Sequence, residues 1–321
     1  MIQFFAVEQD HLALISEEAL FADPNRPRWI NVESPSTDEI RTLTTLYQIP
    51  THYLTSVLDD QEIARVAHLA KKDEQASMLL LTYPQHQTSP LGYLGYSTYP
   101  INFIMVNDLV ITIANHPAPF IQKFVMHPNL SKEMMSEQKW FLTQMLWYIA
   151  HDYVVALNDI NHQMDHLERQ LTTATQNEQI YQIMALQKTL IEFEASLSQN
   201  QPVLSALKSA NFLVTDHTNR LNNAAIIENN QALAMCRTQS QILDQYSNMV
   251  SAVVSNNLNA VMKILTSITI ILTIPTIIGG IYGMNVALPG AHLASAFSLI
   301  LLVTILISTV TLLILKHHNY M

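Results

Sequence analysis

Two long apolar runs lie near the C-terminal end of the chain. Residues 264–282 and 293–315 carry no Asp, Glu, Lys or Arg over 19 and 23 positions. Helices over these runs would be roughly 29 and 35 Å long, which is enough to cross the hydrocarbon core of a bilayer. Only residues 283–292 join them. The pattern therefore predicts a transmembrane hairpin with both of its ends on one side of the membrane.

The first third of the chain alternates short apolar runs with polar segments, which predicts a mixed α/β domain. Apolar, β-branched and aromatic runs predict strands at Phe4–Val7, Trp29–Val32, Met78–Tyr83, Ile101–Val106 and Val110–Ala114. Ser36 followed by Glu39 predicts a helix start, and Pro50 marks the end of that helix. Asn107-Asp108 favours a hairpin turn, and we expect a loop over Gln85–Ser97.

From Ser136 onward the apolar positions change to helical spacing. Intervals of three and four residues, typical of a packed helix seam, connect Leu157, Ile160, Met164, Leu167 and Leu171. Thr172–Asn177 interrupts the pattern, and Pro202 together with Thr215–Asn219 suggests another irregular point. Leu221–Ile274 contains neither Gly nor Pro. It therefore predicts a single helix, roughly 90 Å long if it continues to Tyr282.

These patterns together predict an α+β cytosolic domain followed by a long stalk helix and two C-terminal transmembrane helices. We divide the chain into residues 1–135 (cytosolic α/β domain), 136–220 (antiparallel helices of that domain), 221–263 (stalk), 264–282 (first span), 283–292 (extracytoplasmic turn), 293–315 (second span) and 316–321 (cytosolic tail). A chain with two spans has few ways to form a path through a bilayer. We therefore expect the short turn to be functional.

Charge and leader features predict that both ends of the chain lie in the cytosol. The N-terminal sequence has no basic region followed by a long apolar stretch, so we expect no cleaved signal peptide. Lys263 and Lys316 flank the spans while the turn has no Lys or Arg, as the positive-inside rule requires. We expect a protein of the cell (inner) membrane. The single cysteine, Cys236, excludes an internal disulfide and fits a reducing compartment.

The part of the chain that precedes the spans is strongly acidic. The formal net charge is -10, and residues 258–321 contribute +2 through Lys263 and Lys316, so the preceding part carries -12. Such a field repels nucleic acid, which we do not expect as a partner, and concentrates cations. An acidic surface also promotes solubility, so the sign of the charge alone does not identify the function.

One face of the first span carries small, hydroxyl and amide side chains, which we call the hydroxyl stripe. Intervals of three and four residues connect Asn259, Met262, Thr266, Thr269, Thr273, Thr276 and Gly280. Hydroxyl groups in lipid need hydrogen-bond partners, so the stripe should face another helix or water. Two interpretations are open: close packing between helices, or a polar pore built from several copies. A two-span monomer cannot enclose a channel, so transport would require a symmetric oligomer.

The segment Asn259–Asn285, which ends in Tyr282-Gly283-Met284-Asn285, closely resembles the first transmembrane helix of the CorA family of divalent-cation channels. Trp29–Val32, Leu58–Arg65 and Tyr99–Phe103 resemble the cytosolic domain of that family more weakly. The resemblance implies a homopentameric funnel in the lipid bilayer that conducts Mg²⁺, often with Co²⁺ or Ni²⁺, into the cytosol. The related ZntB branch carries Zn²⁺. No resident cofactor is implied, since the divalent cation is the transported ion.

The resemblance also implies roles for individual residues. Gly283, Met284 and Asn285 would form the selectivity filter. A ring of neutral Asn285 amides could contact a hydrated cation through its water shell without trapping it, which suits an ion that dehydrates reluctantly. Gly283 would let the backbone turn and approach closely. The implied pore lining is Asn259, Met262, Thr273, Thr276 and Gly280, with Leu265 or Thr266 between the first two pairs, and the polar spacing adds Thr269.

The chain departs from the family pattern at positions that matter for ion attraction and gating. Val286–Gly290 contains no acidic residue, although family members of the magnesium type often have one there. The acidic pair through which the family senses cytosolic Mg²⁺ falls on Pro84 and Asn248. Asp244 lies one helical turn before Asn248 and is a candidate regulatory ligand. Pro275 stands one position later than the usual proline of the family.

The histidines could suggest a zinc site. His162 and His166 have the i, i+4 spacing that could bind a metal from one helix face, with Asp165 beside them. No Cys or further His cluster lies near, so we interpret them as surface residues. We interpret His317-His318 as a polar anchor at the interface and His292 as chance placement in the turn.

An enzyme is not indicated by any motif. Asp59, Asp60, Glu62 and Arg65 could form an acid–base group, but charged residues at a helix start usually cap the helix or form solvated pairs. The chain has no Gly-rich phosphate loop, nucleophile elbow or metal-hydrolase motif.

The predicted function is transport of divalent metal cations, Mg²⁺ first, through a pore made of several copies of the chain. A Zn²⁺ transporter of the ZntB type is an alternative, favoured by the uncharged turn. A membrane-anchored metal sensor or scaffold that does not conduct is another, favoured by the missing acidic sites.

Overall fold

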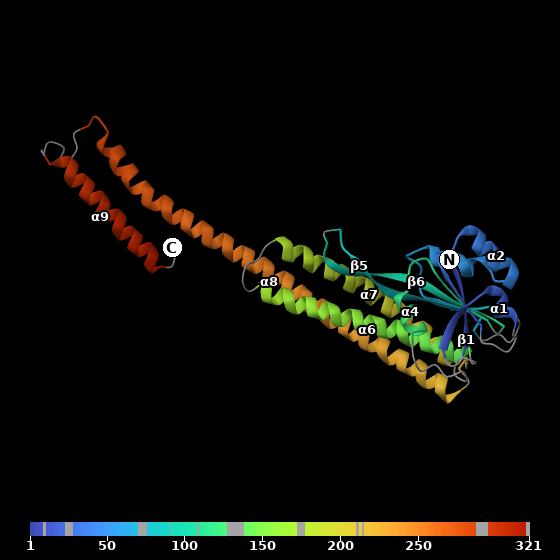
Figure 1. Cartoon of the computed structure of the whole chain (residues 1–321). Helices are drawn as coiled ribbons and strands as arrows, with labels where there is room; N and C mark the ends of the chain where they lie inside the picture. The colour runs from blue at the N-terminus through green and yellow to red at the C-terminus, as the bar shows by residue number, and fades with distance from the viewer. Residues whose placement is uncertain are drawn as a thin grey trace. The chain divides into compact units, whose positions relative to one another are not determined.

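A mixed sheet organises the first of two structural units, Met1–Ser247; the second unit is Asn248–Met321. The structure is a computed structural model (Figure 1) that describes residues 1–8, 11–22, 28–69, 76–90, 92–107, 109–126, 138–171, 177–209, 212–213, 215–286 and 295–318. Within these ranges the sheet has seven strands, which are β1 (Ile2–Glu8), β2 (His11–Ile15), β3 (Arg28–Glu33), β4 (Arg65–Ala67), β5 (Ser77–Thr88), β6 (Leu94–Val106) and β7 (Leu109–Ala114). Their order is β2-β1-β3-β7-β6-β5-β4. β3 and β7 pair in parallel, and the other neighbouring pairs are antiparallel.

The strands predicted from apolar runs are confirmed as β1, β3, β5, β6 and β7, whereas β2 and β4 were not predicted. The loop predicted over Gln85–Ser97 is wrong, because β5 and β6 continue as a hairpin. The Ser89 N–H donates to the Tyr93 carbonyl at 2.8 Å to close it. Most side chains of this extension are polar, so its sequence does not show the apolar pattern of a strand. The extension depends on backbone hydrogen bonds between β5 and β6. A Cβ on Gly95 would lie 3.3 Å from the Gln87 carbonyl oxygen, which explains the glycine.

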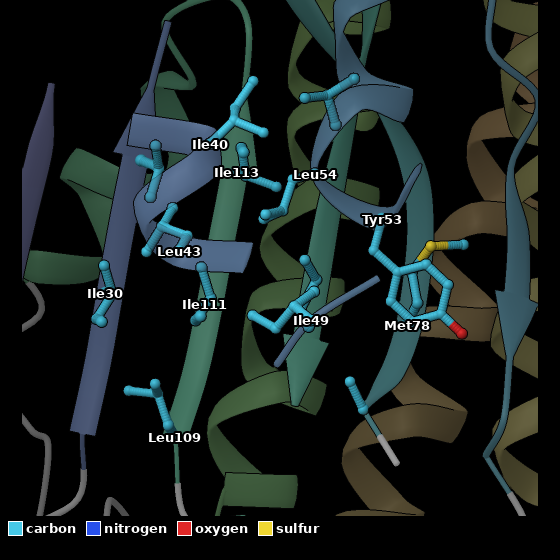
Figure 2. Packing of buried hydrophobic residues seen from close by; sticks show 14 of the residues in the cluster. Ile30, Ile40, Leu43, Ile49, Tyr53, Leu54, Met78, Leu109, Ile111 and Ile113 are labelled. Atoms are coloured by element: carbon cyan, nitrogen blue, oxygen red, sulfur yellow. The ribbon is translucent and has the colours of Figure 1, made fainter. Parts of the chain in front are cut away.

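One apolar core cluster lies between a face of the sheet and the helices α2 (Thr37–Tyr47) and α3 (Thr51–Thr55). Ile30, Ile111 and Ile113 from the strands meet Leu43 and Leu54 from the helices in this cluster (Figure 2). The predicted helix start is confirmed, since Ser36 Oγ accepts from the Glu39 N–H at 3.2 Å and Glu39 Oε2 accepts from the Ser36 N–H at 2.8 Å. The helix ends before Pro50, as predicted.

The short helices α1 (Glu17–Ala22), η1 (Ser56–Leu58) and α4 (Pro119–Val125) complete the α/β part of the unit. The longer helices α6 (Gln138–Leu171) and α7 (Asn177–Ser209) pack against β5 and β6. Figure 1 shows α6, α7 and the first part of α8 (Asp216–Tyr282) running alongside one another.

A side-chain amide of α7 satisfies the backbone of β5 beyond the end of β4. β4 pairs with β5 over Met78–Leu80, and Thr82 lies past this stretch. Asn200 Nδ2 donates to the Thr82 carbonyl at 2.8 Å, and Asn200 Oδ1 accepts from the Thr82 N–H at 3.0 Å. The buried backbone groups of Thr82 are therefore satisfied by α7, which fixes this helix on the sheet.

The irregular point predicted at Pro202 is wrong. α7 continues through this proline to Ser209. The irregular point predicted at Thr215–Asn219 agrees with the start of α8 at Asp216. A proline removes one helical hydrogen bond, and the neighbouring Asn200, Val203 and Leu204 are buried and hold the helix in place. The interruption predicted at Thr172–Asn177 agrees with the end of α6 at Leu171 and the start of α7 at Asn177.

The second unit contains the end of α8 and the helix α9 (Ala296–His317). The prediction of a helix unbroken from Leu221 to Tyr282 is confirmed, with a start at Asp216. Both α8 and α9 contain a window apolar enough to cross a membrane, with mean hydropathy 2.1 and 2.7. In this part of the chain the described residues thus supply two candidate spans.

Candidate functional site

The residues of the hydroxyl stripe all lie on an exposed face of α8. Asn259, Met262, Thr266, Thr269, Thr273, Thr276 and Gly280 are each exposed, as is Leu265. The least exposed positions of the span 264–282 are different ones, namely Ser267, Ile271, Ile274 and Ile278. On a helix of 3.6 residues per turn the centres of these two sets are roughly 140° apart.

The less exposed face of α8 has a counterpart on α9. The half-buried positions of α9 also follow helical spacing and are Ala296, Ile300, Thr304, Ser308, Thr311 and Leu315. Within the described part of the second unit, each helix is the element that can cover the other. We therefore interpret these faces as the packing surface of the hairpin, which leaves the hydroxyl stripe pointing away from it.

The stripe hydroxyls are hydrogen-bonded within their own helix. Thr269, Thr273 and Thr276 donate from Oγ1 to the carbonyls four residues earlier, at 2.9, 2.7 and 2.9 Å. Each hydroxyl has thus used its proton, and the lone pairs of Oγ1 are the part presented outward. Such a face can accept hydrogen bonds from water, including the water shell of a cation. It does not need a neighbouring helix to satisfy it.

The Gly-Met-Asn signature directly follows the last helical turn of α8. The Gly283 N–H donates to the Gly279 carbonyl at 3.0 Å, and the Met284 N–H donates to the Ile281 carbonyl at 3.2 Å. A Cβ on residue 283 would lie 3.2 Å from the Gly279 oxygen, which is closer than most side chains tolerate. Gly283 therefore permits a close backbone approach. Met284 and Asn285 are exposed beyond it.

The positions expected to concern regulation do not form a metal site in the described residues. Pro84 is buried in β5 opposite Thr98. Asp244 on α8 accepts a hydrogen bond from Gln187 Nε2 of α7 at 3.0 Å. Among the residues that the structure describes, no group of three His, Cys, Asp or Glu side chains could hold a metal ion. Asp244 is therefore engaged by a neutral amide.

The other charged candidates are found in local pairs. Arg65 forms an ion pair with Glu62, and Asp59 accepts from the Gln61 N–H at 3.0 Å. Asp60 lies 2.8 Å from Nε2 of His116, whose side chain lines a cleft of about 530 Å³ beside β3 and α4. These are capping and pairing contacts of the expected kind.

The histidine candidates lie on the surface or outside the described ranges. His162 and His166 are exposed on α6, and the rings of His317 and His318 lie 5.6 Å apart. His292 lies outside the described residues.

Sequence reasoning missed a ladder of polar contacts between α8 and α7. Asn222, Asn229 and Cys236 donate to the carbonyls of Leu204, Leu197 and Leu190, each at 3.1 Å. Both series advance by seven residues in opposite directions, so the ladder fixes the register of two antiparallel helices. The seven-residue repeat of small polar residues was the signal that could have revealed it.

The fold and the two candidate spans define a class: a membrane protein with a large α/β unit ahead of its spans. The chain belongs to the family of CorA-like Mg²⁺ transporter proteins, whose family model matches residues 24–317. This family comprises ion transporters and not enzymes, in agreement with the expectation from the sequence.

Individual proteins support this membership. The cobalt/magnesium transport protein CorA of Methanocaldococcus jannaschii is 26% identical over 297 residues, which are 91% of this chain and 90% of the relative. The complete structure of the CorA magnesium transporter from the same organism matches with a TM-score of 0.84 at 23% identity, over 100% of this chain and 99% of that one. The ZntB cytoplasmic domain from Vibrio parahaemolyticus matches with a TM-score of 0.61 at 14% identity, over 79% and 98%. The structural matches confirm the predicted fold: an α/β domain, a long helix and a C-terminal apolar helix.

Proposed function

We propose that copies of this chain assemble as a homopentamer in the cell (inner) membrane and conduct Mg²⁺, with Co²⁺ or Ni²⁺ as related cargo, into the cytosol. The observation that carries this proposal is the exposed hydroxyl stripe, which points away from the hairpin surface and leads to Gly283-Met284-Asn285. Names of similar proteins agree on the cargo, since the relative from M. jannaschii is a cobalt/magnesium transport protein.

Asn285 acts as the contact for the hydrated ion in this proposal. Mg²⁺ releases its water slowly, so a filter that required full dehydration would be slow. A ring of neutral carboxamides offers carbonyl oxygens to the water shell, and it binds weakly enough for release. Gly283 and Met284 set the height and width of this ring.

The stripe extends the path below the filter. With their protons used inside the helix, Thr269, Thr273 and Thr276 present oxygen lone pairs to the axis. Water bound to Mg²⁺ is a hydrogen-bond donor, so these acceptors match the hydrated ion. Asn259, Met262, Leu265 or Thr266, and Gly280 complete the lining.

The proposed topology puts both ends of the chain and the whole first unit in the cytosol. Lys263 and Lys316 stand at the cytosolic ends of the two spans. Because the first unit is acidic, it attracts cations toward the inner mouth.

Flux measurements on the full-length protein in proteoliposomes test this function. Wild type should take up Mg²⁺, and Asn285→Ala should lower uptake by about a hundredfold or more while the oligomer stays intact. Asn257→Ala is the matched control, because Asn257 is an exposed amide roughly 150° from the stripe on α8. Normal Mg²⁺ flux in Asn285→Ala would contradict the filter assignment. An intact oligomer that passes no ion would favour the sensor or scaffold.

Transport of Zn²⁺ is the second candidate, favoured by the absence of an acidic residue in Val286–Gly290. Competition between Mg²⁺ and Zn²⁺ in the same liposomes separates the two. Failure of Zn²⁺ to enter, or to compete, would dismiss it.

A further inference from the structure

The first unit contains a cleft that the proposed ion path does not use. Its volume is about 530 Å³, which lies in the range of clefts that bind small molecules. Side chains of β1, β3 and α4 line it. It therefore lies within the α/β part of the chain and not in the candidate spans.

The cleft lies at the carboxyl ends of the parallel strands β3 and β7. Glu33 and Ala114, the last residues of these strands, both line it. The chain leaves the two strands toward opposite faces of the sheet. α2 packs on the face of Ile30, whereas Phe124 of α4 contacts Trp29 on the other face, with ring centroids 6.1 Å apart. Such a divergence between neighbouring parallel strands opens a crevice, and ligands of α/β proteins commonly bind there.

A chain of largely buried hydrogen bonds fixes the sheet side of the cleft. Trp29 Nε1 donates to Thr112 Oγ1 at 2.9 Å, and Thr112 Oγ1 donates to Asn31 Oδ1 at 2.8 Å. Asn31 Nδ2 in turn donates to Gln3 Oε1 at 3.1 Å. The side-chain oxygen of Gln3 is thus engaged, and its Nε2 group is the part that can donate to a ligand.

His116 is held in place at the edge of the cleft. Its carbonyl accepts from Tyr83 Oη at 2.8 Å, and its ring is stacked on Tyr99 with centroids 3.8 Å apart. Nε2 of His116 lies 2.8 Å from Asp60 Oδ1. Asp60 therefore adds a carboxylate beside the cleft.

The charges around the cleft favour a cation. The Glu33 carboxylate has no hydrogen bond or ion pair with the residues that the structure describes. The amino group of Met1 also lines the cleft, but it donates to the Glu33 carbonyl at 2.6 Å and lies 3.5 Å from Glu39. Burial raises the pKa of Tyr83 above its ordinary 10.0, and the charges of Glu33 and Asp60 raise it further, so both carboxylates lie near the same end of the cleft.

Much of the remaining lining is apolar. These side chains are Phe5, Leu14, Ile121, Val125 and Met126. The Phe5 ring is stacked on Trp29 with centroids 4.4 Å apart, so it offers a fixed surface. No Lys or Arg is among the described lining residues, which disfavours phosphates and other anions. A ligand that fits this lining has an apolar body and a cationic head.

We propose that the cleft binds a small organic cation, an amine with an apolar body, whose ammonium group pairs with Glu33. The body packs against Phe5 and Ile121, and the ammonium gains charge-assisted hydrogen bonds. A bare metal ion is a poorer occupant, because no group of three His, Cys, Asp or Glu in the described residues could hold one.

Three probes of one shape and different charge test the proposal: phenethylamine, which is a cation, neutral phenethyl alcohol, and the anion phenylacetate. Ligand-observed NMR titration of the full-length protein in nanodiscs measures their affinities, with empty nanodiscs as the blank. We expect the amine to bind about tenfold more tightly than the alcohol, and phenylacetate not to bind. Equal affinities for amine and alcohol, tighter binding of phenylacetate, or no binding of any probe would overturn the proposal.

Glu33→Gln isolates the role of the carboxylate. This variant keeps the shape of the side chain, so it should bind the amine and the alcohol equally well. The matched control is Glu178→Gln, which removes the same charge from an exposed position of α7 outside the lining and should keep the preference for the amine. A preference that persists in Glu33→Gln, or that disappears in Glu178→Gln, would refute the pairing with Glu33.

A second variant tests the cleft and not its charge. Gln122→Trp introduces a bulky ring into the lining from an exposed position of α4, so it should prevent binding of both the amine and the alcohol. Unchanged binding of the amine would show that the probe binds elsewhere. Ion flux is not measured in any of these titrations, so they succeed or fail independently of the proposed transport function.

Discussion

The two parts of α8 satisfy their polar side chains in different ways. In the first unit, Asn222, Asn229 and Cys236 donate across to backbone carbonyls of α7. In the second unit, Thr273 and its neighbours donate to carbonyls of their own helix. The first arrangement ties the helix to a partner in one register. The second needs no partner, so it leaves an outward face free to meet water.

This difference shows how one continuous helix can be structural along one part and functional along another. Cross-helix bonds are lost when either partner is changed, so substitutions there should affect stability. Self-bonded hydroxyls contribute little to the fold, so substitutions there should affect what passes the exposed face.

The largest effect is expected at the buried ladder. Asn229→Asp removes the donor to the Leu197 carbonyl and puts a carboxylate against it, so we expect a loss of about 3 kcal/mol or more in the free energy of unfolding. Asn230→Asp, on the exposed side of the next residue, should change it by less than about 0.5 kcal/mol. Denaturant unfolding of the full-length protein in detergent, followed by circular dichroism, measures both. Equal losses would show that the ladder is not a specific support.

A smaller effect, on transport and not on stability, is expected at the stripe. Thr273→Val removes the outward oxygen at constant shape and should lower Mg²⁺ flux about tenfold. Thr309→Val is the matched control, because Thr309 is an exposed α9 residue whose hydroxyl also donates to its own helix, at 2.8 Å. Its flux should stay within about twofold of wild type. If Thr309→Val impaired flux as strongly as Thr273→Val, the stripe would have no special role.

The smallest effect is expected for the reactivity of the Cys236 thiol near pH 8. Burial, and then the nearby negative charge of Glu194, raises the pKa of Cys236 to about 12 from its ordinary 9.0. The folded chain should therefore not react with maleimide near pH 8, whereas the unfolded chain should. The unfolded chain releases this proton first, so the contribution of Cys236 to stability is present below pH 9 and is lost as the pH rises toward 12. Rapid labelling of the folded protein near pH 8 would contradict the buried thiol.

The strands and spans could be predicted because their signals are local. Trp29–Val32 and Val110–Ala114 are apolar enough to indicate buried strands, and Ser36 with Glu39 predicts a cap from four residues alone. β2 and the outer halves of β5 and β6 could not be predicted, because they depend on pairing with another strand. Pro202 misled the prediction because packing of the surrounding helix outweighs the lost hydrogen bond.

The candidate site was predictable in part for the same reason. The stripe from Asn259 to Gly280 follows a helical interval that is visible in the sequence. Which face of α8 turns toward α9 is not visible there, because Ser267 is as polar as the neighbouring Thr266 and yet fully buried. The hydrogen bond from Gln187 to Asp244 could not be predicted from the sequence either, because these residues are far apart in the chain.

The proposed function requires the hydroxyl stripe to face a water-filled axis. The most direct measurement compares Thr273→Cys with Thr309→Cys, each in the full-length protein in liposomes, using a membrane-impermeant, positively charged methanethiosulfonate. A thiol reacts as a thiolate, which forms in water and not in lipid. We expect rapid labelling of Thr273→Cys together with loss of Mg²⁺ flux, and no labelling of Thr309→Cys. Labelling of Thr309→Cys alone, or equal labelling of both, would contradict it.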